Sequence, residues 1–231
     1  MICIYITKGN KRFCKKYRNS KNHVSAIDNH VTVWYNYIKI ESEKGGEYVS
    51  ATFPGTTIEI SKLEKGCSKQ LFDSIFVTGG LTLSQVCVMT GLEPYLIQNW
   101  VKRGFVSSPV RRTYSPSQFA RIIIINMLRE SLQIDQICEL ISITTVTLHD
   151  ERDDIIKDDD LYHRYVDMIA DNYIDIGNRA SVEEAANKAA DEFEPWLPIP
   201  KKEISGILQV MAYAHFAGRL KKNAQDIFSS L

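Results

Sequence analysis

The chain has 231 residues, enough for one domain with a smaller second one or for two small domains, and its 44% hydrophobic residues can form a core. Its longest strongly apolar run, at residues 122–125, is far shorter than a membrane-spanning helix, so we expect no transmembrane segment. The net charge is zero, but residues 1–80 carry +5, residues 81–142 carry +2 and residues 143–231 carry −7. We therefore expect a basic half that faces nucleic acid and an acidic half that serves dimerisation or sensing.

Residues 1–48 have an unusual composition, since the first 23 residues carry seven basic side chains and no acidic one. One hypothesis is a disordered basic arm, with or without DNA binding by that arm. A second hypothesis is a translated leader. Lys44-Gly45-Gly46-Glu47 would be encoded by the purine-rich ribosome-binding sequence AAAGGAGGTGAA, and Val49 follows at the distance of a start codon. Residues 31–40, VTVWYNYIKI, alternate weakly, as a lone strand does.

Residues 50–61 are expected to form a loop or an extended entry to the domain. Ser61 is a candidate N-cap for a helix that runs to about Val77. The apolar face of that helix would consist of Leu63, Leu71, Phe72 and Ile75.

Residues 81–104 have the pattern of two short helices joined by a tight turn. Thr82 or Ser84 can cap the first helix, and Gly91 can adopt the positive φ that the turn needs. Pro94 suits the first turn of the second helix, which ends in basic residues and a glycine. This pattern indicates a helix-turn-helix, whose second helix can enter a DNA major groove.

The loop that follows, VSSPVRRTYSP at residues 106–116, is called the wing below. Beside a recognition helix, such a loop can place Arg111 and Arg112 on phosphates or in the minor groove. Ser115-Pro116 is expected to start a third helix with a very apolar face, and residues 132–141 have room for a fourth.

This stretch resembles a known class of regulators. The order TGLEPYLIQNWVKRGF, a basic loop, RTYS and LRESLQIDQI is similar to the DNA-binding domain of MerR-type regulators, which have a helix-turn-helix, a wing with an Arg-x-Tyr motif and a helix pair. More narrowly, TGLEPYLIQNWVKRGFV, ARIIIINMLRES and DDIIKDDDLY resemble a bacterial family, domain of unknown function 1836, over roughly residues 53–170. The resemblance implies a MerR-like DNA-binding fold.

One departure from the MerR-type pattern concerns the recognition helix. Where those proteins usually carry an arginine, this chain has Gln98, with Asn99 at the neighbouring position. Both residues can bind adenine edges by bidentate hydrogen bonds. The operator preference of MerR-type proteins therefore does not transfer to this chain.

Residues 143–160 are expected to be an acidic linker. Ile143 to Leu148 are β-branched enough for a short strand or a connector. Residues 150–160 hold seven acidic and two basic side chains, which invites a Ca²⁺ or Mg²⁺ site, but the glycine of an EF-hand loop is missing. We expect a solvated linker that ends in the acidic first turn of a helix at residues 158–160.

Residues 161–231 are expected to form a small set of helices. Ser181-x-x-Glu184 is a capping box for a helix that runs to about Phe193. Three prolines at residues 194–200 end it, and Trp196 and Leu197 would anchor that turn. The last helix would run from about Lys202 to Phe228, with one broad apolar face consisting of Ile204, Ile207, Leu208, Met211, Phe216, Leu220 and Ile227. No sustained heptad is expected.

Catalytic and metal-binding patterns are absent from the sequence. The five cysteines, Cys3, Cys14, Cys67, Cys87 and Cys138, include no C-x-x-C pair and indicate buried thiols in a reducing cytoplasm. His163 could line a ligand pocket, although a solvent-facing position is favoured. We expect no enzyme activity, no catalytic or metal-ligating residues and no cofactor.

The sequence thus predicts a mainly α protein with a MerR-like winged helix-turn-helix at residues 49–142, followed by the linker and the C-terminal helical region for dimerisation or sensing. We expect a sequence-specific DNA-binding transcriptional regulator in the cytoplasm. Its partners would be double-stranded DNA and a second copy of the chain, with no membrane. The DNA-binding residues would be Tyr95, Gln98, Asn99, Lys102, Arg103, Arg111, Arg112 and Tyr114, although packing is favoured for Tyr114, as it is for Trp100 and Phe105.

Two alternatives stay open. A protein-interaction module on the same scaffold, without DNA binding, would explain the modest +2 charge of residues 81–142 and the missing recognition arginine. A small-molecule sensor, in which the C-terminal helices enclose an apolar pocket for an effector, is compatible with DNA binding.

Overall fold

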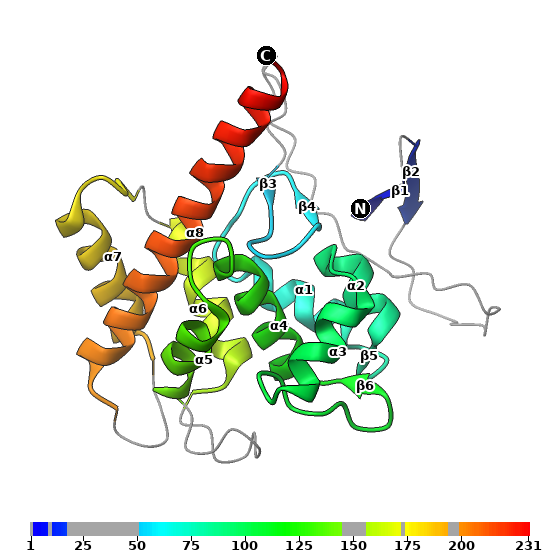
Figure 1. The fold of residues 1–231 in the computed structure, drawn as a ribbon, viewed down its shortest axis with the longest axis horizontal. Coiled ribbons are helices and arrows are strands. Elements are labelled where there is room, and N and C mark those ends of the chain that lie inside the picture. Colours follow the sequence, from blue (N-terminus) through cyan, green and yellow to red (C-terminus); the bar gives the residue numbers. More distant parts are fainter. Residues whose placement is uncertain (1, 9–10, 18–50, 145–155, 172–173, 194–198) are drawn as a thin grey trace.

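The computed structural model describes residues 2–8, 11–17, 51–144, 156–171, 174–193 and 199–231. These residues form a mainly helical protein, as the sequence predicted (Figure 1). The helices are α1 (Cys67–Ile75), α2 (Leu83–Thr90), α3 (Pro94–Lys102), α4 (Pro116–Leu128), α5 (Ile134–Ser142), α6 (Asp158–Asp171), α7 (Arg179–Asp191) and α8 (Lys201–Ser229). No described helix combines the length and the apolar character needed to cross a bilayer.

Three antiparallel strand pairs complete the described elements. They are β1 (Ile2–Lys8) with β2 (Lys11–Tyr17), β3 (Ala51–Thr52) with β4 (Glu59–Ile60), and β5 (Leu81–Thr82) with β6 (Thr113–Tyr114). The β1–β2 pair lies in the region for which a disordered arm was one hypothesis, and residues 2–8 and 11–17 form strands there instead. The weakly alternating residues 31–40 and the proposed start at Val49 lie outside the described residues.

The entry to the domain is a small hairpin rather than a plain loop. Thr57 ties it to the end of α2, because its N–H donates to the carbonyl of Met89 at 2.8 Å. At its tip, a Cβ on Gly55 would lie 2.4 Å from the carbonyl oxygen of Ile123, and the residue has φ 73°. Only glycine allows this close approach of the hairpin to α4.

Helix α1 begins five residues later than an N-cap at Ser61 predicted. Its N-cap is Gly66, at φ 80° and without a side-chain cap. The N–H of Gly66 instead donates to the Asp167 carboxylate of α6 at 2.7 Å. A tertiary contact therefore sets this helix start, where the sequence offered a local cap that the structure does not use.

Helix α4 is the centre of the core. It is buried on all sides from Ser117 to Ile125, and it packs against α2, α5, α6 and α8. A helix that is apolar nearly all round is stable only when other elements surround it. The run of four isoleucines therefore places α4 in the middle of the helical layers.

Residues 158–160 form the acidic first turn of α6, as expected, but Asp158 is buried and not solvated. Asp158 is 3% exposed and forms a buried ion pair with Arg121 of α4, with Nε–Oδ2 and Nη2–Oδ1 distances of 2.6 and 3.2 Å. The Ser117 hydroxyl donates to the Asp159 carboxylate beside it. These contacts fix α6 to α4, so the acidic cluster has a structural role. Residues 145–155 lie outside the description.

His163 is half-buried and packs between α6 and α1, so the favoured solvent-facing position is wrong. Its Nδ1 lies 3.0 Å from the Ser68 hydroxyl, and its ring packs edge-on against Phe72 with 4.6 Å between the centroids. Burial lowers its pKa. The residue joins α6 to α1.

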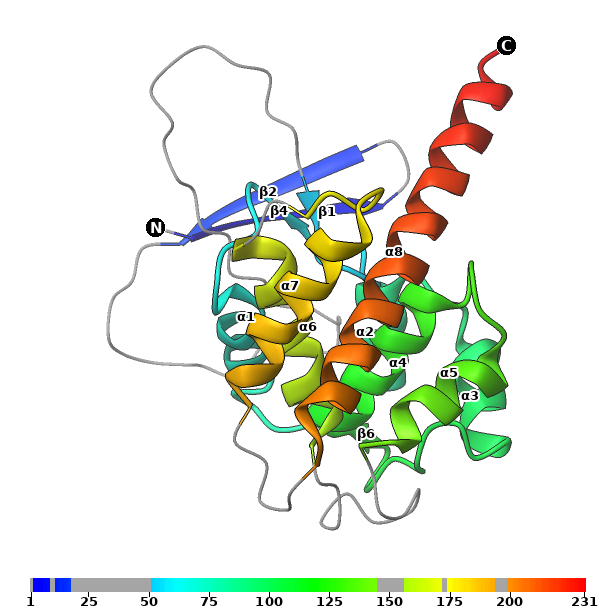
Figure 2. The same cartoon turned by 90° about the vertical axis from the view of Figure 1, so that its left-hand side faces the viewer.

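Two expectations for the last helices are wrong. Helix α7 is capped by Asn178, whose side chain accepts from Ala180, and the Ser181 hydroxyl instead accepts from the N–H of Asp175. Helix α8 buries its first half only, since Leu220 and Ile227 are 62% and 64% exposed. Its second half projects beyond the other helices in both views (Figures 1 and 2). Trp196 and Leu197 lie outside the described residues.

Candidate nucleic-acid interface

Helices α2 and α3 form the predicted pair with a tight turn. Thr82 and Gln85 cap α2 in a reciprocal capping box, and Gly91 ends it at φ 70°. The buried Thr90 hydroxyl donates to the carbonyl of Val86 at 2.7 Å and accepts from the N–H of Leu92. The turn is thus fixed by local hydrogen bonds, which explains why the sequence located it correctly.

The two faces of α3 differ in chemistry. Ile97 and Trp100 are 0% and 5% exposed and hold the helix on the core. The opposite face presents the four predicted residues at i, i+3, i+4 and i+7, all of them exposed: Tyr95, Gln98, Asn99 and Lys102. Because α3 is short and its inner face is fixed, these side chains form one rigid, polar outer surface.

Arg103 has other contacts at the end of α3. Its guanidinium lies 4.3 Å from the centre of the Phe105 ring and 3.9 Å from the Asp135 carboxylate of α5. The side chain is half exposed, so this ion pair contributes little stability. Arg103 therefore connects the end of α3 to Phe105 and to α5, while remaining accessible from solvent.

Tyr114 is the one residue predicted to contact DNA that is buried in the structure. It is 3% exposed, and burial raises the pKa of its hydroxyl. As part of β6, it pairs with Leu81 of β5, immediately before α2. Its position fits the favoured packing role: Tyr114 supports the base of the wing and is not available to DNA.

At the tip of the wing, Arg111 and Arg112 form a two-residue turn. A bridge joins Val110 to Thr113, and the N–H of Thr113 donates to the carbonyl of Val110 at 3.0 Å. The arginines have φ 52° and 66°, as a type I′ turn requires. Such turns favour Asn-Gly, and the left-handed region costs other residues about 1–2 kcal/mol each.

Both arginines are exposed, and neither forms an ion pair with the described residues. The backbone of both residues is strained, and their exposed side chains do not pack on the core. This combination points to a role other than stabilising the fold. The turn leaves both arginine side chains exposed, where an anionic partner can reach them.

Gln118 of α4 holds the wing in place, which the sequence did not reveal. Its side-chain amide donates to the Ser107 carbonyl, the Ser107 hydroxyl and the Ser108 carbonyl at 3.2, 2.9 and 3.0 Å. Its amide oxygen accepts from the N–H of Ser115. The S-x-x-Q spacing at residues 115–118 is a capping-box signal, but the contacts to the wing are long-range and have no local signature.

The cavities lined by described residues differ in size. A hollow lined by Lys65 and by residues of α6 and α7 holds about 10 Å³, enough for about one water molecule. An open cavity of about 510 Å³ lies along the second half of α8. Another open cavity, also of about 510 Å³, lies at the base of the wing, between Phe76, Gly80, Thr113 and Gln118.

Metal and thiol chemistry has no visible centre in the described part of the chain. No three His, Cys, Asp or Glu residues there lie together as a metal site would require. Cys67 is buried, Cys87 and Cys138 are partly buried, and burial raises the pKa of all three thiols. Raised pKa values make these thiols poor nucleophiles at neutral pH.

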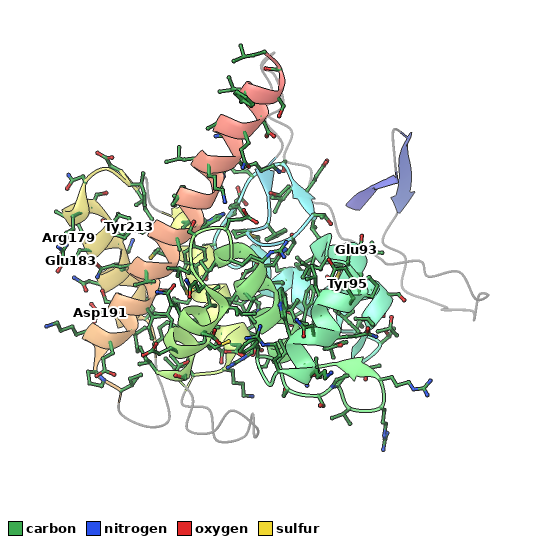
Figure 3. The ribbon with its side chains drawn as sticks, in the orientation of Figure 1. Glu93, Tyr95, Arg179, Glu183, Asp191 and Tyr213 are labelled. Carbon is green, nitrogen blue, oxygen red and sulfur yellow. The ribbon has the colours of Figure 1, made fainter. Side chains whose placement is uncertain are left out.

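The carboxylates of Glu183 and Asp191 on α7 are remote from α3. Figure 3 shows Glu93 and Tyr95, at the start of α3, on the opposite side from Glu183 and Asp191 of α7. DNA on α3 would not meet the acidic side chains of α7.

Comparison with known proteins gives a family match for the middle part of the chain. Residues 81–165 match the family model described as a domain of unknown function (DUF1836). The match begins at β5 and ends within α6, so it includes α2, α3, the loop at residues 106–116 and the Arg121–Asp158 pair. The searches of curated proteins and of solved structures found no match.

Proposed function

We propose that this protein binds duplex DNA sequence-specifically through α3 and the wing, and that it regulates transcription as a MerR-like winged-helix protein. One observation carries the proposal. The outer face of α3 is polar and exposed, and beside it a strained turn projects Arg111 and Arg112 without a described ion pair. A rigid polar helix face with a basic loop is what major-groove binding requires.

The parts of this interface have separate tasks. Gln98 and Asn99 provide bidentate contacts to adenine in the major groove, and Lys102 adds a positive charge at the end of the helix. Arg111 and Arg112 contact phosphates, which fixes the register without selecting a sequence. A nine-residue helix contacts only a few base pairs, so a dimer on a two-fold operator is expected.

The salt dependence of binding tests the electrostatic part. Fluorescence anisotropy with a mixed-sequence duplex, over a series of salt concentrations, should give a steep negative slope of log K against log salt concentration. Arg111→Ala/Arg112→Ala removes two phosphate contacts per protomer, which should reduce that slope by about 1.8 per protomer.

A matched control removes the same charge elsewhere. Arg179 of α7 and Lys202 of α8 are exposed, and Arg179 lies on the opposite side of the molecule from Tyr95 (Figure 3). Arg179→Ala/Lys202→Ala should leave the slope unchanged. An equal loss in both double variants would show that net charge, rather than the wing, determines binding.

A protein-interaction module is the second candidate, and exposed apolar side chains favour it. Tyr95 is 65% exposed, Val88 46% and Val110 71%, all on the helix-turn-helix or the wing. Such side chains are typical of protein-binding surfaces. DNA affinity that is weak and nearly independent of salt would favour this function over DNA binding.

A further inference from the structure

The cavity of about 510 Å³ at the base of the wing lies between three segments of the chain. One is the end of α1 with Phe76, Gly79 and Gly80, and the other two are the outgoing and returning limbs of the wing, within residues 107–110 and 113–116. The volume is in the range of small-molecule sites, about 300–1,000 Å³. A molecule held there therefore contacts both limbs of the wing at once.

Hydrogen bonds fix the shape of this cavity. The Gln118 amide holds the outgoing limb through the carbonyls of Ser107 and Ser108. The Thr113 hydroxyl joins the two limbs, because it donates to the Val110 carbonyl at 2.9 Å. A cavity that exists before a ligand binds costs little to fill, since the protein loses little freedom on binding.

Two glycines leave one side of the cavity without side chains. A Cβ on Gly80 would lie 2.8 Å from Cβ of Thr113 and 2.9 Å from the Tyr114 carbonyl oxygen, so the close approach of this segment to the wing requires glycine. Gly79 has φ 106°, and a Cβ there would have no atom within 4 Å. This open side provides an entrance to the cavity.

Aromatic and apolar side chains line the cavity and its rim. Phe76 is half-buried, and Tyr114 is 3% exposed. At the rim, Val110 is 71% exposed, and Val77, next to Phe76, is 80% exposed. These valines are the most exposed large apolar side chains described before α8. Exposed apolar side chains beside a hollow mark a binding surface, here one that suits an aromatic ring.

None of the described side chains that line the cavity is charged at neutral pH. Burial raises the pKa of the Tyr114 hydroxyl, which therefore stays protonated. An ionised group inside the cavity would lose water without gaining a counter-charge. The Ser108 carbonyl accepts from Gln118 at 3.0 Å, and a carbonyl oxygen has two lone pairs, so it can also accept from a ligand. The cavity thus favours an uncharged molecule that donates an N–H.

We propose that this cavity binds a small, uncharged aromatic molecule with an N–H donor, such as an aromatic amide. The ring lies against Phe76 and Tyr114, and the N–H donates to Ser108. Binding at this site does not require DNA, so the inference goes beyond the proposed function. Because the occupant contacts both limbs, it also changes the freedom of the turn at Arg111 and Arg112. The resulting effect on DNA affinity rests on the proposed function.

Fluorine NMR of para-fluorobenzamide with the full chain, without DNA, tests the chemistry of the site. Para-fluorobenzoate and para-fluorobenzamidine have nearly the same shape but carry a negative and a positive charge. Wild type should bind the amide with a Kd of about 1 mM, as a small fragment does, and each charged analogue at least about ten-fold more weakly. No binding of the amide, or equal binding of a charged analogue, would overturn the proposal.

Substitutions test the location. Ser108→Trp fills the cavity from an exposed position and should abolish binding of the amide. Val88→Trp, an exposed position that does not line the cavity, should bind it as wild type does. Val110→Ala only trims the rim and should weaken binding by about five-fold, which provides a second test if Ser108→Trp does not fold. Wild-type affinity in folded Ser108→Trp or in Val110→Ala would place the amide elsewhere and overturn the proposal.

Fluorescence anisotropy with a DNA duplex tests the link to the wing. Saturating para-fluorobenzamide should change the DNA affinity by at least about two-fold, and unchanged affinity would overturn the link. A protein that binds no DNA even without the amide would instead refute the proposed function. Because the NMR titration contains no DNA, the two failures are distinguishable.

Discussion

The strained turn of the wing allows a substitution that should separate folding from DNA binding. Arg111→Asn/Arg112→Gly gives the turn the residues that a type I′ geometry favours. Releasing two arginines from the left-handed region recovers about 2 kcal/mol, and the extra freedom of glycine in the unfolded chain takes back about 0.5–1 kcal/mol. We expect a net stabilisation of about 1 kcal/mol.

Urea unfolding and DNA titration measure the two effects on the same protein. With a denaturant slope of about 2.5 kcal/mol/M, the urea midpoint should rise by about 0.4 M. DNA affinity should fall, and the salt slope should flatten by about 1.8 per protomer. Arg111→Lys/Arg112→Lys, the control, retains both charge and strain and should match wild type in stability and in slope.

Either half of this prediction can fail separately. If Arg111→Asn/Arg112→Gly lowers the urea midpoint, the turn is not strained in the way its φ angles imply. If the variant is more stable but binds DNA as wild type does, the arginines are not on phosphates. Only a more stable protein with weaker, less salt-dependent binding agrees with the reasoning.

Further predictions concern the core. Asp158→Asn leaves Arg121 buried without its charge partner and should destabilise the fold by about 3–5 kcal/mol in urea unfolding. Asp160, two residues later, is exposed, so Asp160→Asn should change the stability by less than about 0.5 kcal/mol. Similar effects of the two substitutions would refute the buried pair. His215 lies 2.7 Å from the Tyr165 hydroxyl, and burial, aided by Arg219, lowers its pKa to about 4. Because the unfolded histidine binds its proton first, wild type should lose stability as pH falls from about 6.5 to 4, by up to about 3 kcal/mol more than His215→Asn. Parallel stability curves of the two proteins would contradict this.

The sequence predicted helices α2 and α3 and the tight turn between them well, because the signals for these elements are local. The capping box at Thr82, the positive φ of Gly91 and the helix start at Pro94 each depend on residues within one turn. The same is true of Ser115, which caps α4 as expected. Where neighbouring residues decide the backbone conformation, a sequence pattern suffices.

The misplaced features depend on residues that are distant in the chain. Asp158 was expected in solvent because its neighbours are acidic, but Arg121, 37 positions earlier, draws it into the core. Gly66 starts α1 because Asp167 of α6 accepts its N–H. No local pattern encodes such pairs, so composition alone gave the wrong environment.

The sequence located only part of the candidate interface, because only some of its features depend on local signals. The exposed residues of α3 follow from helical periodicity, and all four are where the sequence placed them. The burial of Tyr114 and the support of the wing by Gln118 depend on the pairing of β5 with β6 and on the position of α4.

The most direct test of the central claim is a genomic binding-site selection with purified protein, comparing wild type with Gln98→Ala. We predict that wild type recovers a defined motif, and that Gln98→Ala recovers the same motif with one base position relaxed, by about 1–3 kcal/mol of discrimination. No enrichment of wild type over random DNA at moderate salt would contradict sequence-specific binding and would leave the protein-interaction module as the better account.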